Sequence, residues 1–267
     1  MFKGWNVAYP EYEVITPQTH ESYHMKSLNV REEEKLKGSL LTPTKITDHL
    51  NRCIFESIVK KPDKIKDYDA YLKNVTLKDR DALLYGLFHI TYEEIRNYDI
   101  KCSACAKDYP VTIKISKAFS NNPYPEKDIL KKEVKIPLEV TKGVSAFIKQ
   151  PTLFDEITSL KTSLNAMGSN IDLLTETLVI VKFVQDTEDG ATAEYKDRDD
   201  VIDAYLDLPA KDKRIINKAY VDNFGKYGIE LKMKSYCQFC GQEEEVDLDL
   251  VGNFFTNLYT AWFNWKI

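Results

Sequence analysis

Glycine-rich loops, long apolar runs and an excess of positive charge are all missing from this sequence of 267 residues. Its 10 glycines are spread thinly and form neither G-x-x-x-x-G-K-[ST] nor G-x-G-x-x-G, so no loop that cradles phosphates is indicated. G-x-S-x-G is missing too, and no pair of carboxylates stands out as catalytic. We therefore expect a protein that is not an enzyme.

Charge and hydrophobicity restrict the class further. The 37 Lys and Arg residues against 42 Asp and Glu residues give a net charge of −5, whereas binding to nucleic-acid phosphates needs clustered positive charge. The most apolar internal run, Leu178–Val184, contains Lys182 and is far shorter than the roughly 20 residues of a membrane span. The first residues lack the basic and apolar regions of a secretory signal. We expect a soluble protein without a membrane span.

The five cysteines carry the strongest signal. Four of them form two C-x-x-C pairs, a first knuckle (Cys102–Cys105) and a second knuckle (Cys237–Cys240), which residues 106–236 separate. A C-x-x-C turn points both sulfurs to one side, so two facing knuckles supply the four thiolates of a tetrahedral zinc site. Zinc ribbons usually place their knuckles about 15–20 residues apart, so here the fold itself must bring them together. We predict one structural zinc ion per chain, bound by Cys102, Cys105, Cys237 and Cys240.

The sequence around the two knuckles is repeated in outline. Before each knuckle, apolar residues recur at the i, i+3, i+4 and i+8 positions of an amphipathic helix, and after each knuckle they alternate as in a strand. The helix positions are Leu84, Leu87, Phe88 and Tyr92 in the first copy and Ile216, Ala219, Tyr220 and Phe224 in the second. We predict an α+β, predominantly helical fold with two pseudo-repeated helix–knuckle–strand lobes that share one zinc-ribbon-like site of four cysteines.

Other uses of the thiols stay open. The alternatives are redox dithiols, buried thiols without a ligand, and a catalytic or iron–sulfur centre. Neither pair occupies a strand-to-helix turn of the kind that activates a redox dithiol. The fifth cysteine, Cys53, falls in an apolar helical pattern with Leu50 and Ile54, so we interpret it as a core residue. His20 and His24, four residues apart, are interpreted as polar loop residues.

Composition divides the chain into four parts. We expect an N-terminal arm over residues 1–37, a helical lobe with the first knuckle over 38–120, connecting strands over 121–150, and a helical lobe with the second knuckle over 151–267. Within the last part, helices are predicted over 151–164, 171–184, 197–206 and 211–224. The boundary near residue 121 follows the helix-breaking run Asn121-Asn122-Pro123-Tyr124-Pro125.

Several landmarks in the first half occur in the order that a known family has. They are an acidic segment, a helix with an interior cysteine, an acidic residue and an arginine at a helix start, a tyrosine before a short strand, and the first knuckle: Val30-Arg-Glu-Glu-Glu34, Asn51-Arg-Cys53, Leu77-Lys-Asp-Arg80, Tyr92 and Cys102–Cys105. In this order the chain resembles the baseplate hub and hub-assembly proteins of T-even-type contractile-tailed bacteriophages. The resemblance covers about residues 10–120, and the second knuckle is its main support beyond them.

The resemblance implies a non-enzymatic role in building the hub of a phage tail baseplate, as an assembly factor or as a minor structural subunit. Its partners would be other baseplate hub or tail proteins, met in the host cytoplasm during assembly and then in the virion tail. The alternative is a zinc-ribbon module that binds nucleic acids or serves transcription, for which Lys101, Lys107, Lys114 and Lys117 offer a basic patch. The acidic balance of the chain favours the first interpretation.

Aromatic side chains gather at the C-terminal end, where seven large apolar residues fall within residues 254–265. Phe254, Leu258 and Trp262 have the i, i+4, i+8 spacing of a helix, so one stripe can pack on the core of the protein itself. The apolar surface that remains is too large to face water unless a partner covers it. We therefore predict an aromatic C-terminal helix with Trp262, Phe263 and Trp265 as partner-binding residues.

Overall fold

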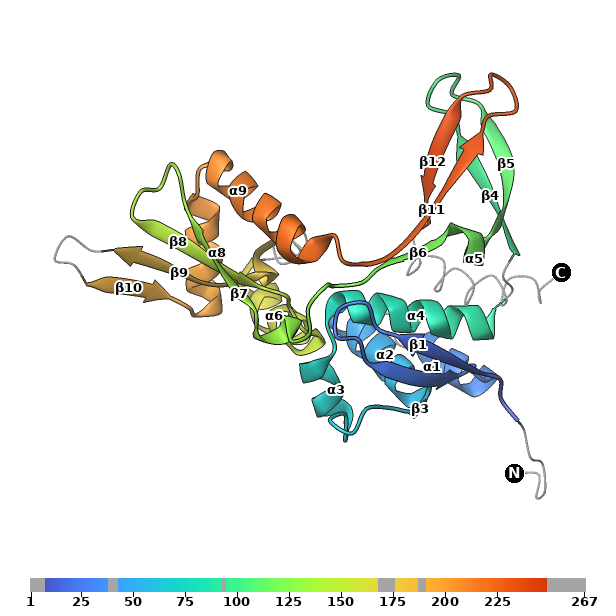
Figure 1. The fold of residues 1–267 in the computed structure, drawn as a ribbon, viewed down its shortest axis with the longest axis horizontal. Coiled ribbons are helices and arrows are strands. Elements are labelled where there is room, and N and C mark those ends of the chain that lie inside the picture. Colours follow the sequence, from blue (N-terminus) through green and yellow to red (C-terminus); the bar gives the residue numbers. More distant parts are fainter. Residues whose placement is uncertain (1–7, 38–42, 93–94, 168–175, 187–190, 249–267) are drawn as a thin grey trace.

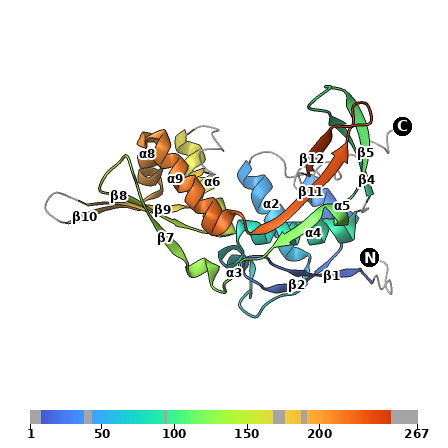
Figure 2. The same ribbon diagram turned by 45° about the horizontal axis from the view of Figure 1, so that its top comes forward.

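The computed structural model of the chain describes residues 8–37, 43–92, 95–167, 176–186 and 191–248. These residues contain twelve strands in four sheets, together with the helices that pack on them. The molecule has two lobes, and a pair of hairpins projects beside one of them (Figure 1, Figure 2). Among the described helices, none is both long enough and apolar enough to cross a lipid bilayer.

The first lobe is built on a three-stranded antiparallel sheet. The strands β1 (Glu11–Ile15), β2 (Ser22–Lys26) and β3 (Ile58–Lys60) lie in that order, and the lobe is completed by α1 (Val30–Lys37), α2 (Pro43–Glu56), α3 (Tyr68–Asn74) and α4 (Leu77–Thr91). Tyr23 and Met25 of the central strand are fully buried. The helix α4 lies so close to β1 that a Cβ atom at Gly86 would come within 2.3 Å of Val14 Cγ2, so this approach depends on glycine.

Side-chain caps begin several of these helices. The Asn29 side chain accepts a hydrogen bond from the Glu32 amide (3.0 Å), and the Glu32 carboxylate accepts one from the Asn29 amide (2.9 Å), which is a complete capping box. The Thr76 hydroxyl accepts from the amide of Asp79 (3.0 Å) at the start of α4. These local contacts explain why the helices start at these residues.

The second lobe is built on a four-stranded antiparallel sheet. Its strands are β7 (Glu133–Pro137), β8 (Val144–Lys149), β9 (Ile180–Asp186) and β10 (Thr192–Tyr195), in the order β10-β9-β8-β7, and its helices are η1 (Ile129–Lys131), α6 (Leu153–Met167), α8 (Arg198–Asp207) and α9 (Ala210–Tyr220). Phe183, Tyr205 and Ile216 are buried at its centre. The two lobes share α6, because Leu153 lies in the first core and Leu160 in the second.

The pair of hairpins, which we call the knuckle arm, stands on the first lobe. The strand β4 (Ile95–Lys101) pairs with β5 (Asp108–Lys114), and the chain continues through α5 (Ile115–Ala118) to β6 (Phe119–Asn122). The long strand β11 (Gly228–Tyr236) pairs first with β6 and then with β12 (Glu243–Asp247). Leu231 and Leu248 anchor the second hairpin in the first core, while the knuckles lie at the far ends of both hairpins (Figure 1).

The predominantly helical fold that we predicted is wrong, because the described strands form four sheets. A helix precedes each knuckle as expected, but a strand follows that helix, so each knuckle is the turn of a hairpin. Both hairpins belong to one arm on the first lobe instead of one to each lobe. The helix predicted over 171–184 is a strand from Ile180 onward. A short apolar run fits a buried strand as well as a buried helix, and only its pairing with other strands decides.

The turn between β1 and β2 ties the first lobe to the second. The side-chain amide of Gln18 donates hydrogen bonds to the carbonyls of Phe224 (3.2 Å) and Tyr227 (3.1 Å), where the π-helical turn η2 (Val221–Gly225) leads from α9 toward β11. The backbone amide of Gln18 and the hydroxyl of Thr19 donate to the buried carboxylate of Asp79, at 2.8 and 2.7 Å. Asp79 on α4 therefore fixes the β1–β2 turn, and Gln18 in this turn binds η2.

We expect Asp79 to make stability depend on pH. Burial raises the pKa of this carboxyl from 3.8 to about 6, against the opposing effect of its hydrogen bonds from Thr19 and Gln18. The folded state therefore binds this proton more tightly than the unfolded state. The stabilisation that this tighter proton binding gives to the folded state is complete below pH 3.8 and is lost as the pH rises through about 6. The variant Asp79→Asn cannot ionise, so its free energy of unfolding relative to wild type should rise by up to about 3 kcal/mol over this range.

Urea unfolding of both proteins at several pH values measures this difference, and any change that affects both proteins equally cancels. The variant Asp63→Asn, at an exposed position, controls for the loss of one negative charge. If the difference between wild type and Asp79→Asn were the same at every pH, Asp79 would not be the buried titrating group.

Candidate metal centre

The two knuckles have the same backbone geometry. In the first knuckle, the Cys102 amide donates to the Lys107 carbonyl (3.0 Å) and the Ala106 amide donates to the Cys102 carbonyl (2.9 Å). In the second knuckle, the Cys237 amide donates to the Gln242 carbonyl and the Gly241 amide to the Cys237 carbonyl, both at 2.8 Å. Each turn thus closes on itself and needs no contact from elsewhere to form.

The residue after each C-x-x-C pair has left-handed backbone conformation. Ala106 has φ 57° and Gly241 has φ 74°. Glycine adopts this conformation freely, whereas the Cβ atom of alanine makes it strained. Gly241 therefore fits the left-handed position of its knuckle without strain, whereas Ala106 is strained at the equivalent position.

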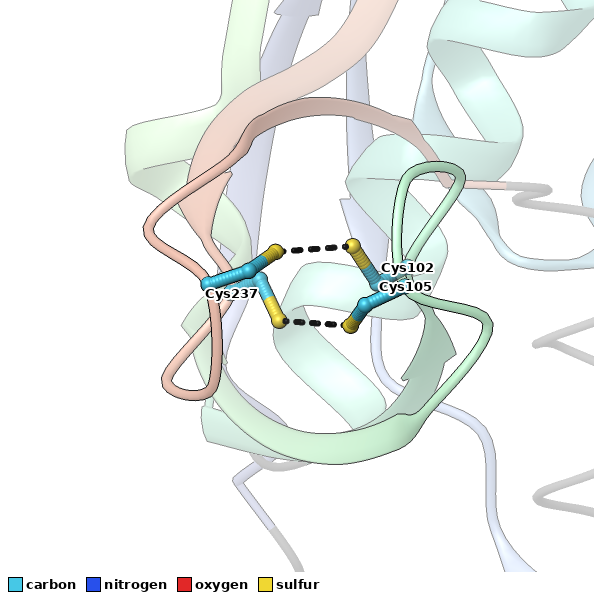
Figure 3. Close-up of side chains that lie close together, drawn as sticks. Cys102, Cys105 and Cys237 are labelled. Carbon is cyan, nitrogen blue, oxygen red and sulfur yellow. Dashed lines mark hydrogen bonds between the residues drawn. The ribbon is translucent and has the colours of Figure 1, made fainter.

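The four thiols meet at one point between the hairpins (Figure 3). Cys102 Sγ lies 3.6 Å from Cys240 Sγ, and Cys105 Sγ lies 3.7 Å from Cys237 Sγ. All four sulfurs are within 4.8 Å of one another. Thiolates that surround a zinc ion at about 2.3 Å in a tetrahedron are about 3.8 Å apart, whereas a disulfide needs about 2.05 Å. The spacing is that of a four-sulfur metal site.

The electrostatics of the cluster favour a cation. Burial raises the pKa of Cys237, but hydrogen bonds from the amides of Phe239 and Cys240 and from neighbouring thiols lower it to about 7. Backbone amides also lower the pKa of Cys102, but burial and the contacts with Cys240 and Cys105 raise it to about 12. One thiol therefore ionises easily, whereas burial and the contacts with Cys240 and Cys105 keep another protonated. A bound cation favours the thiolate form of its ligands.

Further contacts brace the two hairpins around the sulfurs. The backbone amide and the hydroxyl of Ser103 both donate to Glu244 Oε1 at 2.8 Å, and these bonds lower the pKa of Glu244. The Tyr109 hydroxyl donates to Ser235 Oγ at 3.4 Å, in the buried interior between the hairpins. No sequence pattern pointed to these residues, because their partners become neighbours only when the hairpins meet.

A second pattern of metal-ligating type does not form a site. Residues His20–His24 spell H-E-x-x-H, which binds zinc when it lies on a helix, where both imidazoles share one face. Here His20 lies in the β1–β2 turn with left-handed backbone (φ 56°) and His24 lies in β2, so the two imidazoles do not share one face of a helix. His20 Nε2 lies 2.7 Å from the Tyr124 carbonyl oxygen. Within the part of the chain that the structure describes, the knuckle cysteines are the only group arranged to share a metal ion.

The remaining predicted site residues do not join this cluster. Lys101 and Lys107 lie next to the first knuckle. Lys114 lies at the other end of β5, and a strand that rises about 3.4 Å per residue puts it about 20 Å from the knuckle. The four lysines of the alternative nucleic-acid interpretation therefore do not form one patch. Trp262, Phe263 and Trp265 lie outside the described residues.

Comparison with protein families identifies the chain. The model of the T4 bacteriophage base plate protein family matches residues 9–256, which include both knuckles. The chain belongs to this family. The resemblance inferred from the sequence landmarks is thereby confirmed at the level of a T4-type phage baseplate protein. Comparisons with curated proteins and with solved structures gave no match.

Membership in this family associates the baseplate protein with the phage tail and with other tail proteins. The match extends over both lobes and the knuckle arm. The four clustered cysteines of the baseplate protein are compatible with a metal site.

The unequal turn residues generate a prediction. Gly241→Ala should lower the free energy of unfolding by about 1 kcal/mol, because alanine is strained in the left-handed region. A Cβ atom there meets nothing within 4 Å, so the cost comes from the backbone alone. Ala106→Gly, at the equivalent position, should raise the free energy of unfolding by up to about 1 kcal/mol. Urea unfolding of the two variants measures both effects, and effects of the same sign would contradict the shared turn geometry.

Proposed function

We propose that this baseplate protein is a non-enzymatic hub assembly factor or a minor structural subunit of the hub, which acts through contacts with other hub or tail proteins. The observation that carries the proposal is the family match over residues 9–256. The host cytoplasm is its place of action during assembly, and the tail baseplate of the virion its place afterwards. Its surfaces, and not a reaction, then carry its function.

We propose further that Cys102, Cys105, Cys237 and Cys240 hold one structural zinc ion. Four sulfur ligands fill the tetrahedral coordination of zinc and leave no open position for a substrate, which distinguishes a structural site from a catalytic one. Each sulfur of one knuckle lies within 3.7 Å of a sulfur of the other knuckle, and all four lie within 4.8 Å of one another, which supports one ion shared by both knuckles. A redox dithiol would instead pair the two cysteines of one knuckle.

A bound metal ion would stabilise the knuckle arm, because its apolar core is small. The core around the thiols has only three buried residues, Cys102, Tyr109 and Cys237, with Ile100, Cys105 and Val111 partly buried beside them. Such a core removes too little apolar surface from water to hold two hairpins together. A structural zinc site adds its binding free energy to folding and closes a long loop of chain.

The zinc proposal predicts close to one equivalent of zinc in the purified protein, measured by elemental analysis. Cys237→Ser should lose the ion and lower the thermal stability, because three thiolates bind zinc more weakly and the hairpins then separate. Cys53→Ala is the matched control. Cys53 is buried in the first core, away from the knuckles, so this variant should keep its zinc even if its stability falls. A protein that contains no metal, or a Cys53→Ala variant that loses it too, would contradict the proposal.

We propose that the aromatic C-terminal segment supplies a contact to the hub partners. Its density of Trp and Phe supports this, because burying each such side chain contributes about 1.5–3 kcal/mol and these residue types dominate protein interfaces. The described chain ends at Leu248, which is buried in the first core. The aromatic segment begins six positions further along the sequence, at Phe254.

Pull-down of tagged protein from infected cells tests this contact and the hub role together. Wild type should co-purify baseplate hub or tail proteins, identified by mass spectrometry. The variant Trp262→Ala/Phe263→Ala/Trp265→Ala should lose them while keeping its zinc and its fold. Tyr195→Ala, at a half-exposed aromatic residue on the edge strand β10, controls for the loss of surface aromatic area. A triple variant that retains its partners would exclude this segment, and a wild-type protein without tail partners would exclude the hub role.

A further inference from the structure

A cavity of about 640 Å³ opens between the two lobes, away from the knuckles. Its walls come from the β1–β2 turn, from the loop before α3 together with the end of α3, and from the loop that contains η1. Four lysines line it, Lys64, Lys73, Lys127 and Lys131. Preformed pockets of about 300–1,000 Å³ at the junction of two lobes are typical of binding sites.

The charge of this cavity is opposite to that of the protein. Four lysines stand against the lining carboxylates of Glu21 and Asp128 and against Asp69, which pairs with Lys73 at 2.7 Å. One positive charge is left in excess, in a chain whose net charge is −5. Among the residues that the structure describes, Lys127 has no carboxylate within ion-pair distance. Positive charge that converges in a hollow raises the local concentration of anionic ligands.

The walls are fixed before any ligand arrives. Tyr124, which is buried, donates its amide to the Pro17 carbonyl (2.8 Å), and its own carbonyl contacts His20 Nε2, so the η1 loop is fastened to the β1–β2 turn. Lys64 bonds Glu21 at 2.7 Å and joins the third wall to the same turn. A rigid cavity binds its ligand at a lower entropy cost than a loop that must first be ordered.

Two strained residues lie in these walls. His20 has φ 56° and Asp128 has φ 64°, and both line the cavity. Residues other than glycine in this conformation cost about 1–3 kcal/mol and gather at ligand clamps and switch regions. In the described part of the chain, the one other residue of this kind is Ala106 of the first knuckle.

We propose that this cavity binds an acidic segment of a partner protein, through ion pairs between its lysines and carboxylates of the partner. The cavity already contains such pairs, Lys64 with Glu21 and Lys131 with Asp128 (3.4 Å), which a partner's carboxylates can extend. Ile129 and Leu130 in the same wall offer apolar contact to the aliphatic parts of a peptide. The proposal goes beyond the hub role and does not depend on the zinc site.

A phosphate ligand suits these residues less well. Among the residues that the structure describes, the lining contains no arginine, whose planar fork matches phosphate, and no glycine to bring backbone amides close to it. The carboxylates of Glu21 and Asp128 repel phosphates and carboxylates alike, but a run of phosphates, as in a nucleic-acid backbone, has no donor group there to offset the repulsion. A peptide meets both signs of charge better, because its own amides can donate to these two carboxylates.

Fluorescence anisotropy with a labelled hexaglutamate peptide and the full-length protein as purified tests the proposal. Wild type should bind the peptide at low ionic strength and lose it as salt is added. Lys127→Glu/Lys131→Glu should weaken binding by at least about tenfold, because two attractive charges become repulsive. Lys142→Glu/Lys218→Glu, which reverses two exposed lysines elsewhere, makes the same change in net charge and should keep affinity within about threefold of wild type.

Thermal melts and circular dichroism establish that both double variants are folded before they are compared. Absence of hexaglutamate binding to wild type, or equal weakening in the two double variants, would overturn the proposal. Tripolyphosphate and a short single-stranded DNA are tested in the same way. If either one bound in place of the peptide and lost binding only in Lys127→Glu/Lys131→Glu, the cavity would be a phosphate or nucleic-acid site and the acidic-peptide proposal would fail.

Discussion

The thiols of Cys105 and Cys237 lie 3.7 Å apart in space and 132 positions apart in the chain, and the knuckle arm depends on this meeting. Each knuckle folds by itself through its own backbone hydrogen bonds, but nothing local fixes one knuckle against the other. The first hairpin leaves α4 directly, whereas the second arrives only after the chain has built the whole second lobe. A four-sulfur site between them therefore joins two segments of chain that the whole second lobe separates.

The polar contacts between the lobes also join residues that are far apart in the chain. The β1–β2 turn is held by the Asp79 carboxylate on α4 and, through the Gln18 side chain, by the carbonyls at η2. Since η2 leads from α9 into β11, this contact sets where the second hairpin starts. Ionising the buried Asp79 carboxylate costs free energy. Its hydrogen bonds offset part of this cost, and they order the β1–β2 turn, which contacts both lobes.

The surface of the baseplate protein separates two kinds of contact. The knuckle arm extends away from the lobes and combines acidic residues on β12 with exposed Tyr236 and Phe239, while the lysine-lined cavity lies between the lobes on another part of the molecule. A protein that joins several components in an assembly needs such separate surfaces, because two partners can then bind without excluding each other. Membership in the baseplate family is consistent with such an arrangement.

The sequence by itself determined the local features of this protein. The C-x-x-C spacing indicated two knuckles, the apolar spacing indicated α4 and α9, and the order of landmarks indicated the baseplate family, since each of these depends on residues close together in the chain. Tertiary structure alone decided whether the apolar run at Ile180 became a helix or a strand, which side chains brace the thiols, and that four lysines from separate segments line one cavity. Strand pairing, cross-hairpin bonds and cavities join residues far apart in the chain, and no local pattern records which distant partner each residue meets.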